Sequence, residues 1–462
     1  MDSYFKFRIL ISNSLLWLVL FSVLLIDLSA SELEKYKLFS NYGFYKRINN
    51  VKIGSSILSI SGQLRLRYEH FDGFGLKGYN PSEEDDLLLE RIRIDFSFQH
   101  STQKFLFIQM QDAHAFLTHY RDRNFPDSNP IEDTLDVRQL YIQWLNIKGS
   151  PFGFRIGRQE ISYGDQRVFG PGQWGNTGRY AWDAIMMKIN TKWFDNDLWV
   201  GKYLTYKSDE WINKPIKNFY TIVNYTQLKN LPFILDVFYV FKKDRRRSST
   251  SGGMNELNLN SIGFQMEANR IKELSNIGLT FVLQVGNYGG EDVYAYGGNI
   301  KCIFSIPIHT NPKLGFQFTY GSGDKDPLDN KYGTFDGVYG GRDILFYGYL
   351  NLFFWSNLRE HEINFNISPN KRVNLFAQYN YFLLSQAKDA WYTTSLKICR
   401  RDISGNSGNF LGQEMDMRIV ITLNDQIQLM LGGGIFFPCD FVKNTGIASK
   451  TNWFFIQTNI TI

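Results

Sequence analysis

From about Leu58 to the end of the chain one unit recurs, consisting of about ten residues of alternating polar and apolar side chains followed by a turn. In residues 63–69 (QLRLRYE) the odd positions are polar or charged and the even positions are apolar or aromatic. Successive side chains on a β-strand point to opposite faces, so each unit has one apolar face and one ionic face. A soluble sandwich rarely puts paired arginines on the same face of strand after strand, whereas a barrel in lipid has a wet interior that holds them. The pattern therefore predicts a barrel that crosses a membrane.

Eighteen segments carry this alternation, an even number as in bacterial single-chain barrels. The predicted fold is all-β, a transmembrane antiparallel β-barrel of about 18 strands that follows an N-terminal signal peptide. The predicted strands lie at approximately 58–70, 87–99, 104–112, 136–146, 152–160, 182–191, 197–206, 219–227, 233–242, 260–269, 277–288, 293–306, 312–320, 357–367, 372–384, 410–423, 427–436 and 452–462.

The lengths of the connections test this count independently. Short links such as 100–103 alternate with long ones such as 113–135, and outer-membrane barrels have short periplasmic turns and longer outer loops. The alternation is nearly unbroken, with 289–292 as a short link on the side predicted to be external. One more apolar stretch, 343–355, would make the count odd, so we expect it to fold into the barrel mouth within loop 321–356.

The bulk composition agrees with a barrel and excludes other classes. Aromatic residues make up 16% of the chain and 39 residues are glycine, which suits aromatic girdles and many turns. No internal run of eighteen apolar residues occurs, which excludes a helical membrane protein. The net charge of +5 is small for 462 residues, so no nucleic-acid partner is expected.

The N-terminus has the features of a secretory signal. A basic start precedes an apolar core at 15–26 and small residues suitable for cleavage. An uncleaved membrane anchor is the alternative. We expect export to the outer membrane and the following division of the chain: signal peptide 1–31, periplasmic N-terminal segment 32–57 and barrel 58–462.

No metal or cofactor is expected. The cysteines are sparse, lie far apart and lack metal-ligand spacing, and whether two of them pair stays open: Cys302, Cys399 and Cys439. His114 and His119, with Asp112 and Asp122, suggest a metal site. Their predicted position in a polar loop favours solvated histidines instead.

Several motifs occur in a fixed order between about 60 and 460. They are GRQE at 157–160, YGD at 163–165, WGNTGR at 174–179, GSGD at 321–324, DAWY at 389–392 and FFPCDF at 436–441. Together they resemble the bacterial alginate export family of outer-membrane barrels, with Cys439 in place of a usual glycine. The resemblance implies an eighteen-stranded barrel that passes an anionic polysaccharide through an arginine-lined lumen.

The ionic strand faces supply the candidate pore-lining residues. By parity these are Arg65, Arg67, Glu69, Arg91, Arg93, Asp95, Arg155, Arg372, Glu414, Asp416 and Arg418. An arginine on the lipid side near the midplane costs about 2–4 kcal/mol, which favours the lumen. Guanidinium groups donate paired hydrogen bonds to carboxylates, and interspersed acids keep such binding weak enough for release. For any single arginine, pairing with an acid is an equally good interpretation; for the set, transport is favoured.

The motif residues Arg158 and Glu160 need a separate argument. Straight parity puts both on the lipid side, whereas a bulge at Gly157 would turn them inward, and the family motif favours the bulge. Arg179 and Asp183 stand where the following loop re-enters a strand, and we expect them to brace the mouth.

These observations predict a porin rather than an enzyme, because no Gly-x-Ser-x-Gly elbow and no evident histidine partner set occur. The expected cargo is alginate or a similar uronate polymer; the alternative is a general anion-selective porin for small organic carboxylates. A glycosidase and an adhesive barrel are weaker alternatives. Expected partners are outer-membrane lipid, lipopolysaccharide and periplasmic export proteins. The basic run 242–247 either contacts lipopolysaccharide phosphates or is simply solvated.

Overall fold

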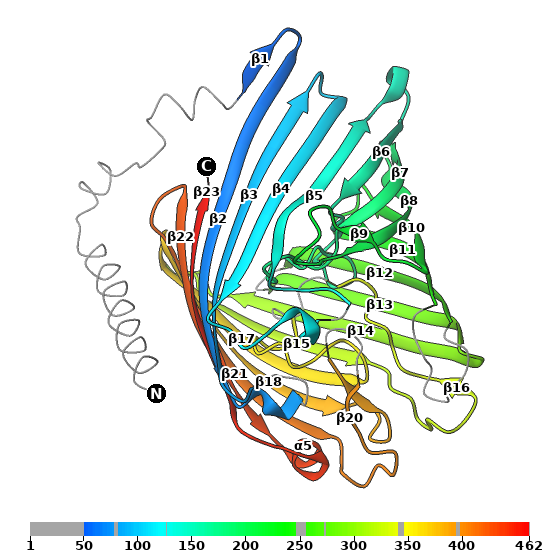
Figure 1. Ribbon diagram of the computed structural model, residues 1–462. Helices are drawn as coiled ribbons and strands as arrows, with labels where there is room; N and C mark the ends of the chain where they lie inside the picture. Colours follow the sequence, from blue (N-terminus) through cyan, green and yellow to red (C-terminus); the bar gives the residue numbers. More distant parts are fainter. Residues whose placement is uncertain are drawn as a thin grey trace.

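The computed structural model describes residues 50–77, 82–125, 127–245, 256–271, 274–340, 346–393 and 398–461. Over these residues the chain forms a closed antiparallel β-barrel (Figure 1). The last strand pairs with the first, with Thr461 opposite Gln63 and Asn452 opposite Asp72, so this part of the wall has no open edge. The predicted signal peptide and most of the predicted periplasmic segment lie outside the described residues.

Eighteen long strands of the described chain form the wall, which confirms the predicted fold. They are β2 (Ser56–Asp72), β3 (Asp85–Gln99), β4 (Lys104–Phe116), β5 (Asp133–Trp144), β6 (Phe152–Gln159), β7 (Trp182–Asn190), β8 (Phe194–Thr205), β10 (Phe219–Leu228), β11 (Ile234–Asp244), β12 (Leu257–Ile271), β13 (Leu274–Tyr288), β14 (Glu291–Ser305), β15 (Lys313–Gly321), β17 (Leu358–Asn370), β18 (Val373–Leu384), β21 (Phe410–Thr422), β22 (Ile427–Pro438) and β23 (Thr451–Thr461).

The period-two pattern sorts side chains between the two faces as predicted. The apolar positions of β2 and β3 point outward and are 36–42% exposed: Leu66, Ile92, Ile94, Phe96 and Phe98. Arg65 and Arg67, which alternate with them, point inward and are 3% and 2% exposed. The outer face therefore offers the apolar band that packs against lipid hydrocarbon.

The two ends of the barrel differ in their connections. The end at which β2 begins and β23 ends has short turns, and we call it the short-turn end; we call the other the long-loop end (Figure 1, top and bottom). A tight turn between β13 and β14 is the exception at the long-loop end, where Gly289 and Gly290 adopt φ values of +62° and +100° that favour glycine. The remaining elements are short: β1 (Val51–Ile53), η2 (Phe74–Lys77), η3 (Asp122–Asn124), η4 (Ile147–Gly149), β9 (Lys214–Pro215), β16 (Lys331–Tyr332), β19 (Ala390–Tyr392), β20 (Ile398–Arg401) and α5 (Asp440–Thr445).

Two long loops fold back into the barrel. We call residues 160–181, between β6 and β7, the first inner loop, and the described residues 322–340 and 346–357, between β15 and β17, the second inner loop. Phe169 of the first is buried against Trp199 of the wall, and Phe353 of the second is buried against Phe382. The hydrophobic core of the protein therefore lies inside the barrel, in contact with inward strand faces.

The apolar stretch 343–355 behaves as expected where it is described. Residues 346–355 form no strand, and most of them are buried within the second inner loop; residues 341–345 lie outside the described part of the chain. Cys302, Cys399 and Cys439 are free thiols. No described helix has the length and apolarity needed to cross a bilayer.

Candidate functional site

Four inward arginines form a continuous patch, which we call the arginine wall: Arg65 and Arg67 on β2, and Arg91 and Arg93 on β3. The strand register places Arg65 directly opposite Arg91 and Gln63 opposite Arg93. All four side chains are buried. Because like charges repel and buried charges need compensation, this patch requires hydrogen-bond acceptors from another part of the molecule.

The backbone of the first inner loop supplies many of these acceptors. Arg65 donates to the carbonyl oxygen of Gln173 at 2.9 Å, and Arg91 donates to the same oxygen at 3.2 Å. Arg67 donates to the carbonyl oxygen of Trp174 at 2.9 Å and lies 4.1 Å from the centroid of its indole ring. The arginine wall thus holds the tip of this loop against β2 and β3.

Carboxylates compensate only part of the arginine wall. Arg67 Nε lies 2.6 Å from Glu69, and Arg93 Nη1 lies 3.8 Å from Glu160. Within the described chain, the other two wall arginines have no carboxylate oxygen within 4.0 Å. The arrangement therefore carries an excess of positive charge beside neutral carbonyl groups.

Asn176 fixes the same loop tip from a second direction. Its Nδ2 atom lies 2.8 Å from the carbonyl oxygen of Glu90, 2.9 Å from that of Ile131 and 3.0 Å from that of His114. Its Oδ1 atom accepts a hydrogen bond from Arg65 at 3.0 Å. Asn176 therefore links β2, β3, β4 and the segment that precedes β5, a role that the WGNTGR motif did not suggest from the sequence.

Trp174 of this tip also touches the last strand of the barrel. The centroid of its ring lies 5.8 Å from that of Trp453 and 5.0 Å from that of Phe455, both on β23. Since Arg67 on β2 stacks on the same indole, the tip spans the junction between β2 and β23.

Arg138 is a buried, inward-facing side chain that strand parity missed. The register of β4 and β5 shifts at Gln109, leaving Arg138 without a cross-strand partner, and this bulge turns it inward. Arg138 is completely buried and donates to Glu160 at 2.7 Å and to the carbonyl oxygen of Thr177 at 2.7 Å. No signal in the sequence marks this bulge.

Glu160 is the main counter-charge on this side of the lumen. It lies just beyond the end of β6 and faces inward, next to Arg138 and Arg93, without the predicted bulge. Burial would raise the pKa of Glu160, but the opposing effects of Arg138 and Arg93 are larger together and lower it below its usual value. Glu160 is therefore ionised at neutral pH.

The predicted bulge at Gly157 is wrong. The pairing of β6 with β7 runs without a shift through this residue, although its φ of +126° favours glycine. Arg158 is consequently aligned with Leu140, which is exposed on the outer face, and with Asp183. Arg158 donates to Asp183 at 2.9 Å near the long-loop end, so the pair lies apart from the arginine wall.

The other predicted residues have separate surroundings. Arg155 donates to Gln143 at 2.8 Å, and Asp95 accepts from Gln109 at 2.8 Å, both on inward faces. Arg372 is exposed in the turn between β17 and β18, so its predicted position on a strand is wrong.

Arg179, which we expected to brace the mouth, joins the two inner loops. It donates to the carbonyl oxygen of Gly340 at 3.3 Å. Its guanidinium carbon also lies 5.0 Å from the ring centroid of Tyr180 and 5.3 Å from that of Phe354.

A second charged patch, which we call the acid wall, consists of Glu360 and Glu362 on β17 and Glu414 and Asp416 on β21. All four are buried, and no described cation lies within 4.0 Å of them. Backbone N–H groups of the second inner loop donate to two of them, from Leu350 to Glu414 at 3.0 Å and from Tyr349 to Asp416 at 3.4 Å. Arg418 lies beside this patch, 5.6 Å from the ring of Tyr349. Acids thus hold the second loop by its donors, as arginines hold the first by its acceptors.

The two inner loops meet inside the barrel. Phe169 and Tyr339 form a parallel bridge, in which Gly170 N donates to Tyr339 O at 3.0 Å and Tyr339 N donates to Val168 O at 2.9 Å. Their side-chain rings also pack, with centroids 5.7 Å apart. The loops therefore form one structure across the lumen.

Lys242, on β11, links the second inner loop to the barrel wall. It is buried and lies 2.9 Å from Asp336 of the second inner loop, so the expectation that the run 242–247 is wholly external is wrong for its first residue. Lys243 and Arg245 pair with Glu256 at 2.5 Å and 3.1 Å, and residues 246–247 lie outside the described chain.

Asp324 makes the packing of the second inner loop sensitive to pH. Burial, aided by the nearby charge of Asp389, raises the pKa of Asp324 to about 7. The folded state therefore binds the proton more tightly than the unfolded chain does. The resulting stabilisation is complete below the ordinary pKa of about 4 and is lost as pH rises through about 7.

We accordingly expect the thermal unfolding midpoint to fall by a few degrees between about pH 6 and about pH 8, measured in detergent or lipid. The variant Asp324→Asn removes one titrating group and should make this dependence less steep. An equally steep dependence in the variant would assign it to other groups.

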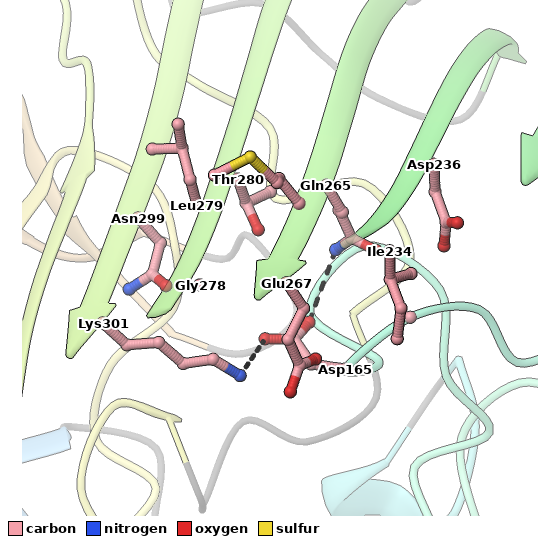
Figure 2. A pocket seen from close by; sticks show the side chains of 12 residues that line it. Asp165, Ile234, Asp236, Gln265, Glu267, Gly278, Leu279, Thr280, Asn299 and Lys301 are labelled. Atoms are coloured by element: carbon pink, nitrogen blue, oxygen red, sulfur yellow. Dashed lines mark hydrogen bonds and ion pairs between the residues drawn. The ribbon is translucent and has the colours of Figure 1, made fainter. Parts of the chain in front are cut away.

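A small recess opens in the wall beside the first inner loop, close to the short-turn end of β11 to β14. Figure 2 shows Lys301 directed toward Asp165 of the loop, at 3.9 Å, with Gln265 beside them. Asp236 and Glu267 also line it, so its three carboxylates outnumber its one lysine. The lining of this recess therefore carries an excess of negative charge, which disfavours an anionic ligand there.

The histidines do not assemble a metal site. His114 lies on β4, not in a loop, and contacts Asp112 at 3.1 Å, whereas His119 contacts Asp85 at 2.9 Å. Across the described ranges, no three histidine, cysteine or acidic side chains are placed to hold one metal ion.

Comparisons with known proteins agree with this architecture. The family model described as alginate export matches residues 56–455. No curated protein sequence matches the chain. The barrel is similar to the crystal structures of Pseudomonas aeruginosa OpdQ, with a TM-score of 0.59 and 11% identity over 89% of this chain and 99% of that one, and OccK11 (OpdR), with a TM-score of 0.55 and 10% identity over 88% and 96%. Acinetobacter baumannii OccAB4 has a TM-score of 0.53 and 8% identity over 87% and 97%. At these identities the likeness shows the fold alone.

Proposed function

We propose, from the premise that this chain belongs to the alginate export family, that it carries an anionic polysaccharide of the uronate type outward through its lumen. The family and the fold are those of an outer-membrane porin barrel. The proposal therefore concerns what the porin carries, and it assigns transport and not catalysis to the charged residues inside.

The arginine wall is the observation that carries this proposal. Four buried guanidinium groups lie side by side, and Arg65 and Arg91 have no carboxylate of the described chain within 4.0 Å. Repeating carboxylates of a polymer can pass from one guanidinium to the next, and binding divided over several weak sites permits release. A pore for small organic carboxylates is the second candidate, favoured by the same excess of positive charge.

The proposal predicts that the pore prefers anions. Reversal potentials across a salt gradient in planar bilayers should show greater anion than cation permeability. The double variant Arg65→Gln, Arg91→Gln should reduce this preference, because it removes two uncompensated charges, whereas Arg121→Gln in an external loop should not. Equal or greater cation permeability in the wild type would show that the acids dominate the field.

Flux in proteoliposomes separates the two candidate cargoes. Labelled short oligouronates should leave vesicles that contain the protein faster than they leave vesicles without it. If small dicarboxylates cross and oligouronates do not, the polysaccharide proposal fails and the general anion porin stands.

A further inference from the structure

The first inner loop occupies the same guanidinium donors that a substrate carboxylate would need. The wall arginines donate to the carbonyl oxygens of Gln173, Trp174 and Gly175, and Arg138 donates to that of Thr177. These acceptors follow one another along the loop tip, as carboxylates follow one another along a polyuronate. The tip is thus an internal ligand of the wall.

The hydrogen bonds of the wall are incomplete with this internal ligand. The Nε atoms of Arg65 and Arg91 and one Nη atom of Arg93 are buried and have no hydrogen-bond partner among the described residues. Each carbonyl group offers one oxygen and no charge. A carboxylate offers two oxygens and a full negative charge, and hydrogen bonds between ionised groups are roughly twice as strong as neutral ones.

We propose that anionic substrate and the first inner loop compete for the arginine wall, so that binding of the substrate displaces the loop tip and opens the lumen. This inference rests on the proposed function, since it takes the wall as the substrate site, and it adds that the site is masked by the protein's own backbone. A ligand shifts such an equilibrium only by binding one state better, and here the displaced state alone exposes the donors.

Two features of the tip make it the part that moves. The tip is held by hydrogen bonds from the wall arginines, by those that its own Asn176 donates to the wall backbone, and by the indole of Trp174 against Trp453 and Phe455. Phe169, earlier in the loop, instead packs in the aromatic core with Trp199 and Tyr339. Gly172, Gly175 and Gly178 punctuate the tip, and two of them have positive φ values of +62° and +81°. Residues 171–178 can therefore change conformation while residues near Phe169 stay in place.

The experiment uses a cysteine as a reporter of loop position. Thr177 is completely buried in the tip, so Thr177→Cys, made in a chain with Cys302, Cys399 and Cys439 replaced by serine, should react slowly with a water-soluble thiol reagent. Short oligouronates should accelerate this reaction about tenfold, within the usual range of coupling between two equilibria. A neutral oligosaccharide of the same length should not. In planar bilayers the same oligouronates should raise the mean conductance of the wild type.

Matched arginine variants identify the competing donors. The double variant Arg65→Gln, Arg91→Gln should react fast without ligand and lose the response to oligouronate. Arg121 also donates to backbone carbonyl groups, those of Thr118 and Tyr120, both at 2.6 Å in a different loop, so Arg121→Gln should keep the full response.

The outcomes separate this inference from the proposed function. If oligouronates cross the pore but leave Thr177→Cys reactivity unchanged, the competition is overturned and the transport proposal stands. If they neither cross nor alter reactivity, both fail. Faster reaction together with higher conductance supports the competition.

Discussion

Replacing Arg138 with glutamine is expected to destabilise the barrel by about 3–5 kcal/mol, the usual cost of removing one partner of a buried ion pair. Glu160 would remain buried with only the more distant Arg93, at 3.8 Å, nearby. The first inner loop would also lose the hydrogen bond from Arg138 to Thr177. Urea unfolding in lipid vesicles measures the stability, and single-channel recording should show a larger and noisier conductance.

A double variant separates these two effects. Arg138→Gln combined with Glu160→Gln removes both buried charges, so stability should largely return while the loop anchor stays absent and the conductance stays high. If the double variant is as unstable as the single one, the buried charge of Glu160 is not the cause of the loss.

The second large effect is expected at Lys242. The variant Lys242→Met should cost about 3 kcal/mol, at the lower end for a broken buried pair, because the Val338 backbone still donates to Asp336. The second inner loop should also detach from β11. Chemical unfolding and conductance again provide the measurements.

The next residue provides the control. Lys243 pairs with Glu256 at the partly exposed long-loop end, and Lys243→Met should cost less than about 1 kcal/mol. Equal losses of stability in the two variants would show that burial does not increase the contribution of the Lys242–Asp336 ion pair.

The barrel wall is predictable from sequence because its information is local. Each strand records its own inward and outward faces in the alternation of its residues, and this placed Arg65, Arg91 and Glu414 inside correctly. Link lengths add the strand directions. The even count then places the apolar stretch 343–355 in a loop, as the structure shows for its described part.

The contents of the lumen are not predictable in this way. A bulge at Arg138 shifts the strand register by one residue and so turns this side chain to the inner face of the sheet. The bulge expected at Gly157 does not exist. Lys242 belongs to a charge run that looks external, yet its partner, Asp336, is distant in sequence. Many of the acceptors of the arginine wall are backbone carbonyl groups. Because every residue has one, the residue types in the sequence do not predict which of them accept these hydrogen bonds.

The contacts of Trp174 bear on how the barrel is assembled. Its indole packs against Arg67 on one side and against Trp453 and Phe455 on the other, so it reaches the first and the last strand from within. The binding position of the indole forms only after β2 and β23 have paired in the correct register. A shift of one residue in β23 would turn the rings of Trp453 and Phe455 toward lipid. The first inner loop therefore stabilises the junction between β2 and β23 from inside the barrel. It can adopt this conformation only in barrels that have closed in the correct register.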